Sequence, residues 1–220
     1  MFNSRCNFTG WTAVAVSGLL LASTTGCVGL LANIMHAANG NLAPAAFDDL
    51  AGKRVAVLCL SDSEAFGPTE ASMDIASRVS KLLETNVDEI MLVPSQEIAD
   101  WVDRNDWDQL DYSAVGRGVN ADMVVVVDLE TFSLRDGKTL YKGRSDLKIT
   151  AYDMNQDAKR VFTAEPPQIQ FPTNSGYHTT DISEDDFNRE FIAHVSRRVA
   201  RNFYPYDIAE DYAEDVTLIR

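Results

Sequence analysis

The sequence is poor in cysteine, with three in 220 residues. We expect Cys6 to lie in a leader peptide that is removed and Cys27 to carry a lipid, so the mature chain has no cysteine pair for an internal disulfide. The remaining residue, Cys59, falls inside the apolar run VAVLCL. Because a reactive thiol needs exposure and basic neighbours, Cys59 is predicted to be a small buried side chain.

Histidine is equally scarce. His36, His178 and His194 lie far apart in the sequence, and no two have the spacing of metal ligands. The acidic stretch SEDD at 183–186 lacks the glycine and the distal glutamate of an EF-hand loop. Its acids are explained as charges at the N-terminus of a helix. The sequence therefore predicts no metal site.

Motifs of catalysis and phosphate binding are also missing. GRG at 116–118 precedes a strand and no Lys-Ser or Lys-Thr pair follows, so we expect a helix-ending turn in which glycine takes a positive φ. Asp122 and Asp128 would share a strand face, but about 20 Å of strand separates them at roughly 3.3 Å per residue. With Glu130 they are predicted to be solvated strand ends. We expect no catalytic residue and no cofactor, and hence no enzyme.

Basic residues are outnumbered, with 19 Lys and Arg against 33 Asp and Glu and a net charge of -14 at pH 7. Loss of residues 1–26 would remove one charge, that of Arg5, and leave -15. Such a surface repels nucleic acid and anionic lipid head groups, so neither is expected as a direct partner. Attachment to a membrane would then need a covalent lipid anchor.

No apolar run in the sequence reaches the length of about twenty residues that a membrane-spanning helix needs. Residues 1–10 hold one arginine and no acid, residues 11–22 are mostly apolar, and small residues follow up to Cys27. This three-part layout predicts an export signal over residues 1–26. Thr25 and Gly26 suit a lipid-attachment site at Cys27.

Two interpretations of this cysteine stay open. Bacterial lipoproteins usually carry Leu or another aliphatic residue three positions before the cysteine, where this sequence has Thr24. The alternative is ordinary cleavage, after Ala22 or further along near 37–38. If Cys27 is lipidated, Val28 in place of Asp favours the outer membrane facing the periplasm, by resemblance to bacterial lipoproteins.

The exported part is predicted to form a tether at 27–51, one domain at 52–206 and an acidic tail at 207–220. The run RVAVLCL at 54–60 indicates a strand covered on both faces, and Asp136-Gly137 between apolar segments indicates a hairpin with a tight primed turn. The expected fold class is α/β (α+β): a single mixed β-sheet with a central apolar strand, helices packed on it and an antiparallel hairpin half.

The other expected elements follow from hydrophobic spacing and capping residues. They are a helix at 69–85, a strand at 90–94, a helix with Ser95 as N-cap, a short helix at 112–115, strands from 123, 145 and 159, a long loop at 166–186 and a helix from 187.

This order resembles a periplasmic α/β family that includes the curli-secretion lipoprotein CsgG, the exopolysaccharide lipoprotein PelC, the penicillin-binding-protein activator lipoprotein LpoB and the amino-terminal domain of TolB. The likeness is carried by KRVAVLCLSD, MLVPSQEIADWV, GRGVNADMVVVVDLETF and LKITAYDMNQDAKRVFTAE, and it spans roughly residues 52–204. The resemblance implies a scaffold for protein contacts and, in some members, for ring assembly, without catalysis.

Pore-forming members of this family insert two long amphipathic hairpins per subunit, with about ten residues in each spanning strand. The hairpin at 124–152 can supply one at most, and its tip, LRDGKTLYKGRSD, is too charged for lipid. A pore is therefore not expected.

Aromatic residues gather in the long loop and after the last helix, where they could form an exposed recognition patch. The candidates for partner binding are Phe171, Tyr177, Tyr204 and Tyr206. The sequence thus predicts a lipid-anchored envelope protein that binds other envelope proteins or itself, within secretion, envelope or polysaccharide machinery. The alternative is an exported small-molecule-binding or hydrolytic domain with the loop at 166–186 as a lid, although no small molecule is evident.

Overall fold

The computed structural model describes residues 42–61, 69–105 and 111–209. The proposed leader, Cys27, Val28 and most of the acidic tail lie outside these residues. Apart from Leu42, all described residues belong to the unit Ala43–Arg220. Its elements in chain order are β1 (Leu42–Ala43), β2 (Arg54–Ser61), α3 (Glu70–Asn86), β3 (Met91–Leu92), α4 (Ser95–Arg104), α5 (Tyr112–Gly118), β4 (Met123–Asp136), β5 (Leu140–Asp153), η1 (Met154–Gln156), β6 (Lys159–Ala164), β7 (Ile169–Phe171), β8 (Tyr177–His178), α6 (Glu184–Ala200) and β9 (Tyr206–Asp207).

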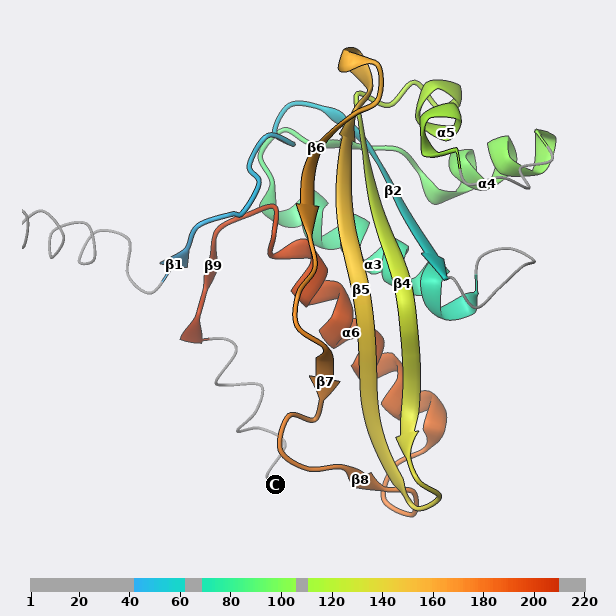
Figure 1. The fold of residues 1–220 in the computed structure, drawn as a ribbon, viewed down its shortest axis with the longest axis vertical. Coiled ribbons are helices and arrows are strands. Elements are labelled where there is room, and N and C mark those ends of the chain that lie inside the picture. The colour runs from blue at the N-terminus through green and yellow to red at the C-terminus, as the bar shows by residue number, and fades with distance from the viewer. Residues whose placement is uncertain (1–41, 62–68, 106–110, 210–220) are drawn as a thin grey trace, which may run out of the picture. The chain divides into compact units, whose positions relative to one another are not determined.

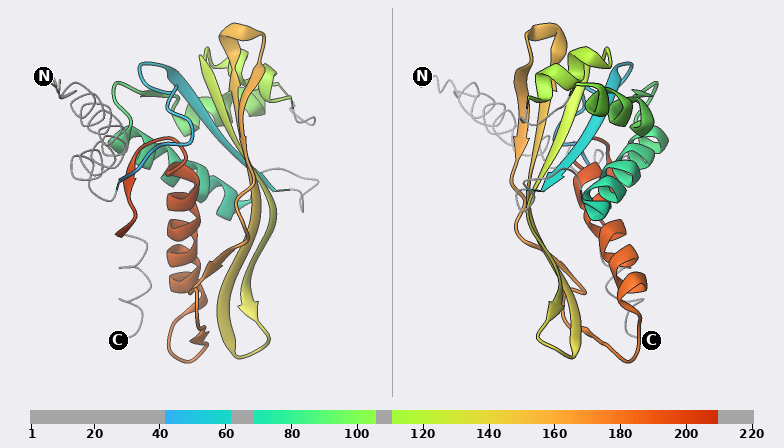
Figure 2. Two further views of the ribbon diagram at one scale, coloured as in Figure 1. Left: turned by 60° about the vertical axis from the view of Figure 1, so that its left-hand side comes forward. Right: turned by 90° about the vertical axis from the view of Figure 1, so that its right-hand side faces the viewer.

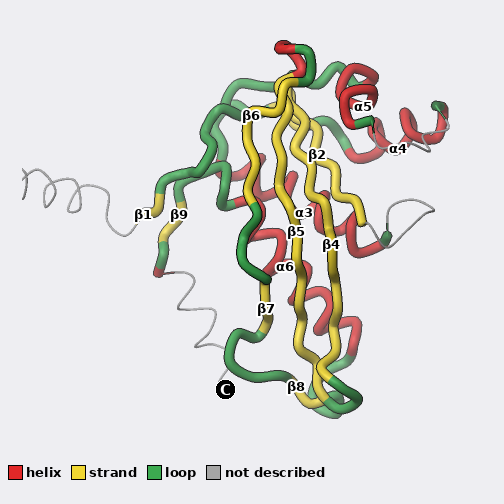
Figure 3. The backbone as a smooth tube through the Cα atoms, in the orientation of Figure 1, coloured by secondary structure: helices red, strands yellow, loops and turns green. Residues whose placement is uncertain are grey.

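The main sheet has the order β3-β2-β4-β5-β6, and β7 and β8 pair with β5 farther along that strand (Figures 1 and 3). β3, β2 and β4 are parallel, whereas β4, β5 and β6 are antiparallel. The predicted fold class is therefore confirmed. β1 and β9 form a separate two-stranded sheet.

Strand β2 is covered on both faces, as its continuous apolar run predicts. Val55, Val57 and Cys59 join the core that includes α3 and α6. Ala56 and Leu58 point the other way, into a smaller core under α4 and α5. This division follows from the period of two along a strand, and it makes Cys59 a buried side chain as predicted.

The two long helices begin at side-chain caps. Thr69 accepts a hydrogen bond from the backbone N–H of Ser72 at the start of α3, and Ser183 accepts one from Asp186 at the start of α6. Three acids occupy the first turn of α6 and two arginines its last turn, in agreement with the helix dipole. Figure 2 shows α6 lying along the long hairpin of β4 and β5.

The predicted hairpin at Asp136-Gly137 is confirmed, but its turn is longer than expected. Asp136 pairs with Leu140, so three residues connect the strands, and among them Gly137 has a positive φ of 73°. β4 also carries register shifts after Leu129 and after Ser133. Such bulges bend a strand and increase its twist.

The segment 166–186 is not one long loop. Ile169–Phe171 forms β7 and Tyr177–His178 forms β8, and both pair with β5. The prolines and polar residues that suggest a loop from the sequence occupy the connections before and between these short strands. Three-residue and two-residue strands leave too little periodicity to be recognised without their partner.

Two local predictions were wrong. Ser95 is the first residue of α4, and Pro94 before it is the N-cap, which makes no side-chain cap hydrogen bond. In GRG, Gly116 and Gly118 lie inside α5, and the positive φ belongs to Asn120. The glycines are needed for close contact instead, because a Cβ on Gly118 would lie 1.9 Å from the Trp101 indole nitrogen.

Part of the segment expected to be a tether packs on the domain. Leu50 is fully buried, and the Phe47 ring lies 5.4 Å from the ring of Phe162 and 6.3 Å from that of Phe203. The Phe47 backbone N–H also donates to the carbonyl of Asn202.

Candidate functional site

The aromatic residues proposed for partner binding do not form one exposed surface. Phe171 and Tyr204 are each 7% exposed and belong to the core, so the expected exposure of these two side chains is wrong. Phe171 packs against the rings of Phe187 and Phe191 in α6 and pairs with Gly143 of β5, which the local pattern does not reveal. Tyr177 and Tyr206 are half-buried, and a role for them in partner binding stays a prediction.

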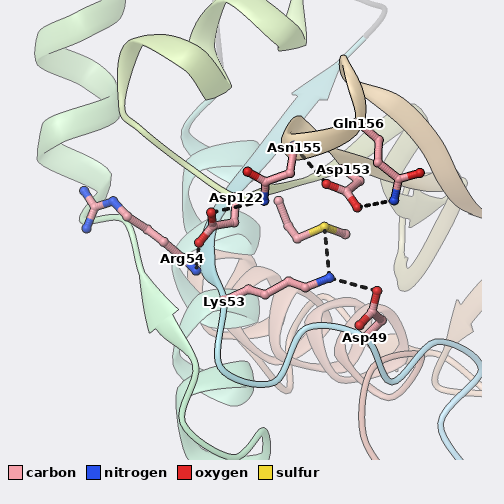
Figure 4. A network of polar contacts seen from close by, with 8 residues as sticks. Asp49, Lys53, Arg54, Asp122, Asp153, Asn155 and Gln156 are labelled. Atoms are coloured by element: carbon pink, nitrogen blue, oxygen red, sulfur yellow. Dashed lines mark hydrogen bonds and ion pairs between the residues drawn. The ribbon is translucent and has the colours of Figure 1, made fainter.

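The carboxylate of Asp122 lies in a polar network at one end of the sheet (Figure 4). It accepts the backbone N–H of Arg54 at 2.9 Å and the side-chain amide of Asn155 at 3.2 Å. The carboxylate of Asp153 accepts hydrogen bonds from the backbone N–H of Asn155 and from the side-chain amide of Gln156. These bonds join the start of β2, the start of β4 and η1, so Asp122 holds chain segments together.

Asp128 is occupied separately, by the phenol of Tyr112 at 2.8 Å. Asp128 lies within β4, so the prediction that it is a solvated strand end is wrong. The Arg54 side chain extends away from Asp122 and forms two hydrogen bonds, of 2.8 and 2.9 Å, to the carboxylate of Glu97. Both bonds come from the same guanidinium nitrogen, and they tie α4 to β2.

The network makes a prediction about acid stability. Its hydrogen bonds, chiefly the one from the Arg54 N–H and then the one from Asn155, lower the pKa of Asp122. A carboxyl group with a lowered folded pKa stabilises the fold above its unfolded pKa of about 3.9, and that contribution is lost as pH falls through the folded value. Asp122→Asn should therefore be less stable than wild type at pH 7, and the difference should shrink below about pH 4.

Urea unfolding at several pH values, followed by circular dichroism, measures this difference. Asp100→Asn, at an exposed position of α4, is the control and should track wild type throughout. A gap between Asp122→Asn and wild type that is the same at pH 7 and pH 3 would contradict the assignment.

The structure describes two of the three histidines. His178 is exposed and its Nδ1 lies 2.8 Å from the hydroxyl of Thr180, whereas His194 is buried against the ring of Phe171. His36 lies outside the described residues. Within residues 42–61, 69–105 and 111–209, no group of three His, Cys, Asp or Glu side chains could hold a metal ion.

None of the described helices is long and apolar enough to cross a membrane.

A groove of about 430 Å³ is one feature of the described residues that the sequence did not reveal. One wall is the segment that leads into β7, and the other is the C-terminal end of α6 with the residues that follow it. A third side comes from the start of the domain. The lining residues are Pro44, Ala46, Pro166, Pro167, Gln168, Ile169, Gln170, Thr173, Arg198, Arg201, Asn202 and Tyr206.

The chemistry of this groove differs from that of the chain as a whole. Two arginines line it, and none of its described lining residues is acidic. Arg201 is 6% exposed, and its guanidinium lies 4.8 Å from the centre of the Tyr206 ring. Arg198 is exposed. The groove combines an apolar proline surface, neutral amides and two arginine side chains.

The sequence held a partial signal for this site. Pro166-Pro167 stands out in an extended segment, and the arginines of RRVAR end a helix in an otherwise acidic chain. What the sequence does not show is their proximity, because Arg197 lies 30 positions after Pro167 along the chain.

Comparisons with known proteins give structural similarity alone. No family model matches the chain, and no curated protein matches it. Among solved structures, the chain is similar to the PelC dodecamer from Paraburkholderia phytofirmans, with 10% identity and a TM-score of 0.42 over 74% of this chain and 95% of that chain. It is also similar to lipoprotein GNA1162 from Neisseria meningitidis, with 12% identity and a TM-score of 0.42 over 66% and 96% of the two chains.

A third similarity is to the C-terminal domain of LpoB from Salmonella enterica, with 13% identity and a TM-score of 0.39 over 56% of this chain and 87% of that chain. At this level the similarities carry no information on activity or partners. PelC and LpoB are two of the proteins that the sequence resembles.

Proposed function

We propose that this chain is a lipid-anchored protein of the bacterial cell envelope whose α/β domain works by binding other proteins or a second copy of itself. The observation that carries the proposal is the sequence STTGC, which places Cys27 directly after small residues at the end of the apolar run 11–22. By resemblance to bacterial lipoproteins, Val28 supports the outer membrane, with the domain facing the periplasm.

Several features support contact rather than chemistry as the mode of action. Asp122 and Asp128 hold neighbouring elements together, and the thiol of Cys59 is buried. The net charge of -14 disfavours nucleic acid and anionic lipid as partners. The groove, by contrast, places two arginine side chains and two prolines at its surface, and arginine is one of the residue types enriched in protein interfaces.

Binding of a small molecule is the second candidate, because the groove adjoins the segment 166–170 that the sequence suggests as a lid. The segment 166–186 is attached to β5 through β7 and β8. Opening it as a lid would break these strand pairs, so a preformed groove fits the architecture better than a closing one.

The anchor is tested by intact mass spectrometry of protein from the membrane fraction. We expect the mass of residues 27–220 plus acyl chains, and loss of the acyl mass in Cys27→Ala, because the thiol is the attachment point. Cys6→Ala changes a cysteine of the leader and should leave mass and location unchanged. A variant in which the leader of a soluble exported protein is fused to residues 28–220 lacks Cys27 and should be found entirely in the soluble fraction.

Two results would contradict the anchor. One is an unmodified chain whose N-terminus lies at another position, and the other is a Cys27→Ala protein whose mass still includes acyl chains. The first leaves an exported domain without a lipid, and the second places the acyl chains at a residue other than Cys27. Cross-linking in intact cells then tests the binding role. A wild-type chain that forms no cross-link to any envelope protein or to itself would contradict that role.

A further inference from the structure

We propose that β6 is a docking strand for a second copy of this chain, so that two copies join by antiparallel pairing of their β6 strands about a two-fold axis. This inference rests on the proposed function, in which the domain binds other proteins or itself. It gives that function a surface and a partner.

β6 forms one outer edge of the main sheet (Figure 1). Its six residues pair with β5 on one side, and no strand of the described chain pairs with the other side. Within the described residues, no backbone hydrogen bond joins the segment 159–165 to anything but β5. An open row of N–H and C=O groups can accept an added strand. The opposite edge of the sheet, β3, has only two residues and is a much shorter template.

Three side chains of this segment lie on the sheet face that points away from α6. Arg160 and Thr163 stand opposite β5 residues that are two positions apart. Glu165 bonds to Lys148, two positions further along β5. Positions two apart share one face of a strand, so Arg160, Thr163 and Glu165 share a face as well. Phe162 points the other way, into the core that includes α6, and the register shift beside it sets the spacing of the row.

The charges along this face run from positive through neutral to negative. Arg160 is exposed and makes no ion pair or side-chain hydrogen bond within the described residues. Glu165 is exposed and bonds to Lys148 at 2.7 Å through one carboxylate oxygen, so its other oxygen can accept a further bond. Antiparallel pairing about an axis at Thr163 places each Arg160 opposite Glu165 of the second copy. It also brings the two Thr163 side chains together, which is a favourable cross-strand pair.

Other partners and other directions fit this edge less well. Parallel pairing in register would place like charges opposite each other, which is destabilising. Lys159 and the register shift are features by which natural sheets keep arbitrary strands away from their edges. The net charge of -14 opposes contact between two copies, but at physiological ionic strength the Debye length is about 8 Å, so charges far from the contact are largely screened. A two-fold pair also closes on itself, because it uses the same strand of both copies.

The first test is a disulfide across the axis. Opposite residues of antiparallel strands have Cβ atoms about 4.5–5.5 Å apart, close to the separation that a disulfide needs. Cells that carry the full chain with Thr163→Cys should therefore give a disulfide-linked dimer after oxidation with copper phenanthroline. Ser77→Cys, at an exposed position of α3, is the control and should give no more dimer than the wild-type chain.

The second test reverses the charges in the full chain, with self-association measured by sedimentation equilibrium in density-matched detergent. Arg160→Glu and Glu165→Arg should each weaken self-association by about tenfold or more, because symmetry makes each change act twice. An equal mixture of these two variants should associate about as well as wild type, since each reversed charge then meets its opposite. Two controls should stay within about twofold of wild type: Arg78→Glu, an exposed charge reversal on α3, and Lys148→Gln, which removes only the ion pair within the chain.

The inference is overturned by a wild-type chain that stays monomeric, by Thr163→Cys giving no more dimer than Ser77→Cys, or by a mixture that associates no better than its two components. A disulfide from Thr163→Cys to a different protein in place of a second copy would also overturn it. If these tests fail while Cys27 carries lipid and the wild-type chain cross-links to envelope proteins, this inference falls and the proposed function stands. If Cys27 is unmodified and the charge reversals behave as expected, the pairing stands and the anchor falls.

Discussion

Replacing Phe191 with alanine is expected to lower the free energy of unfolding by about 3–5 kcal/mol, the largest loss of stability that we predict for a single substitution here. Phe191 is fully buried in α6, and its ring lies 5.0 Å from that of Phe132 and 6.5 Å from those of Phe171 and Phe187. Truncation removes this contact surface and leaves a cavity between α6 and the hairpin. Urea unfolding measured by circular dichroism gives the value.

The control for this loss is Met73→Ala, which truncates a side chain that is 53% exposed on α3. Its effect should stay within about 0.5 kcal/mol, because little apolar surface is removed from the interior. If Phe191→Ala gives no soluble protein, Phe191→Leu provides a milder change. A loss below about 1 kcal/mol for Phe191→Ala would mean that α6 does not pack on the hairpin as described.

Gly143 provides a second test of the same contact. A Cβ at Gly143 would lie 2.5 Å from two carbons of the Phe191 ring, so Gly143→Ala should cost about 1–3 kcal/mol by overpacking. In combination with Phe191→Leu, which removes the ring, the loss should be smaller than the sum of the single losses by about 1 kcal/mol. Strict additivity in this double-mutant cycle would contradict a direct contact between the two positions.

The second large effect concerns the thiol of Cys59. Burial, together with the nearby charge of Asp128, raises its pKa from 9.0 to about 12. At pH 8 the folded protein then has about a thousandfold less thiolate than an ordinary cysteine, and thiolate is the species that reacts. In a chain with Cys6→Ala and Cys27→Ala, we expect Ellman's reagent to label Cys59 about a thousandfold more slowly under native conditions than in urea.

A second variant tests what causes the slow labelling of Cys59. Burial is the larger contribution and the charge of Asp128 the smaller, so Asp128→Asn should raise the native labelling rate only modestly. Native labelling as fast as in urea would show that β2 is not enclosed between the two helical layers.

Much of the fold follows from local pattern. The apolar runs of β2 and β4, the helical spacing of α3 and α6 and the hairpin at Asp136-Gly137 each depend on residues close together in the sequence, and these elements were confirmed. The tight turn predicted for the hairpin was wrong, because three residues connect its strands. The mixed sheet follows from their order, because helices connect the early strands and a hairpin joins the later ones.

The errors arise where the deciding contact is distant. β7 and β8 are strands because β5 offers its edge to them, and Phe171 is buried because α6 covers it. Gly118 is required by the indole of Trp101 on another helix, not by a turn in its own segment. A prediction from neighbouring residues assigns such positions to loops or to the surface, because their contact partners are distant in the sequence.

The sequence by itself determined the acidic charge, the predicted export signal with Cys27, and the type of each long element, since all of these depend on composition or on neighbours along the chain. Only the tertiary structure decided the candidate site. The groove joins residues near positions 44, 166 and 198, and its two arginines lie beside the segment that leads into β7 only because the fold brings these parts of the chain together. Distances in space, not along the chain, set the field that a ligand encounters.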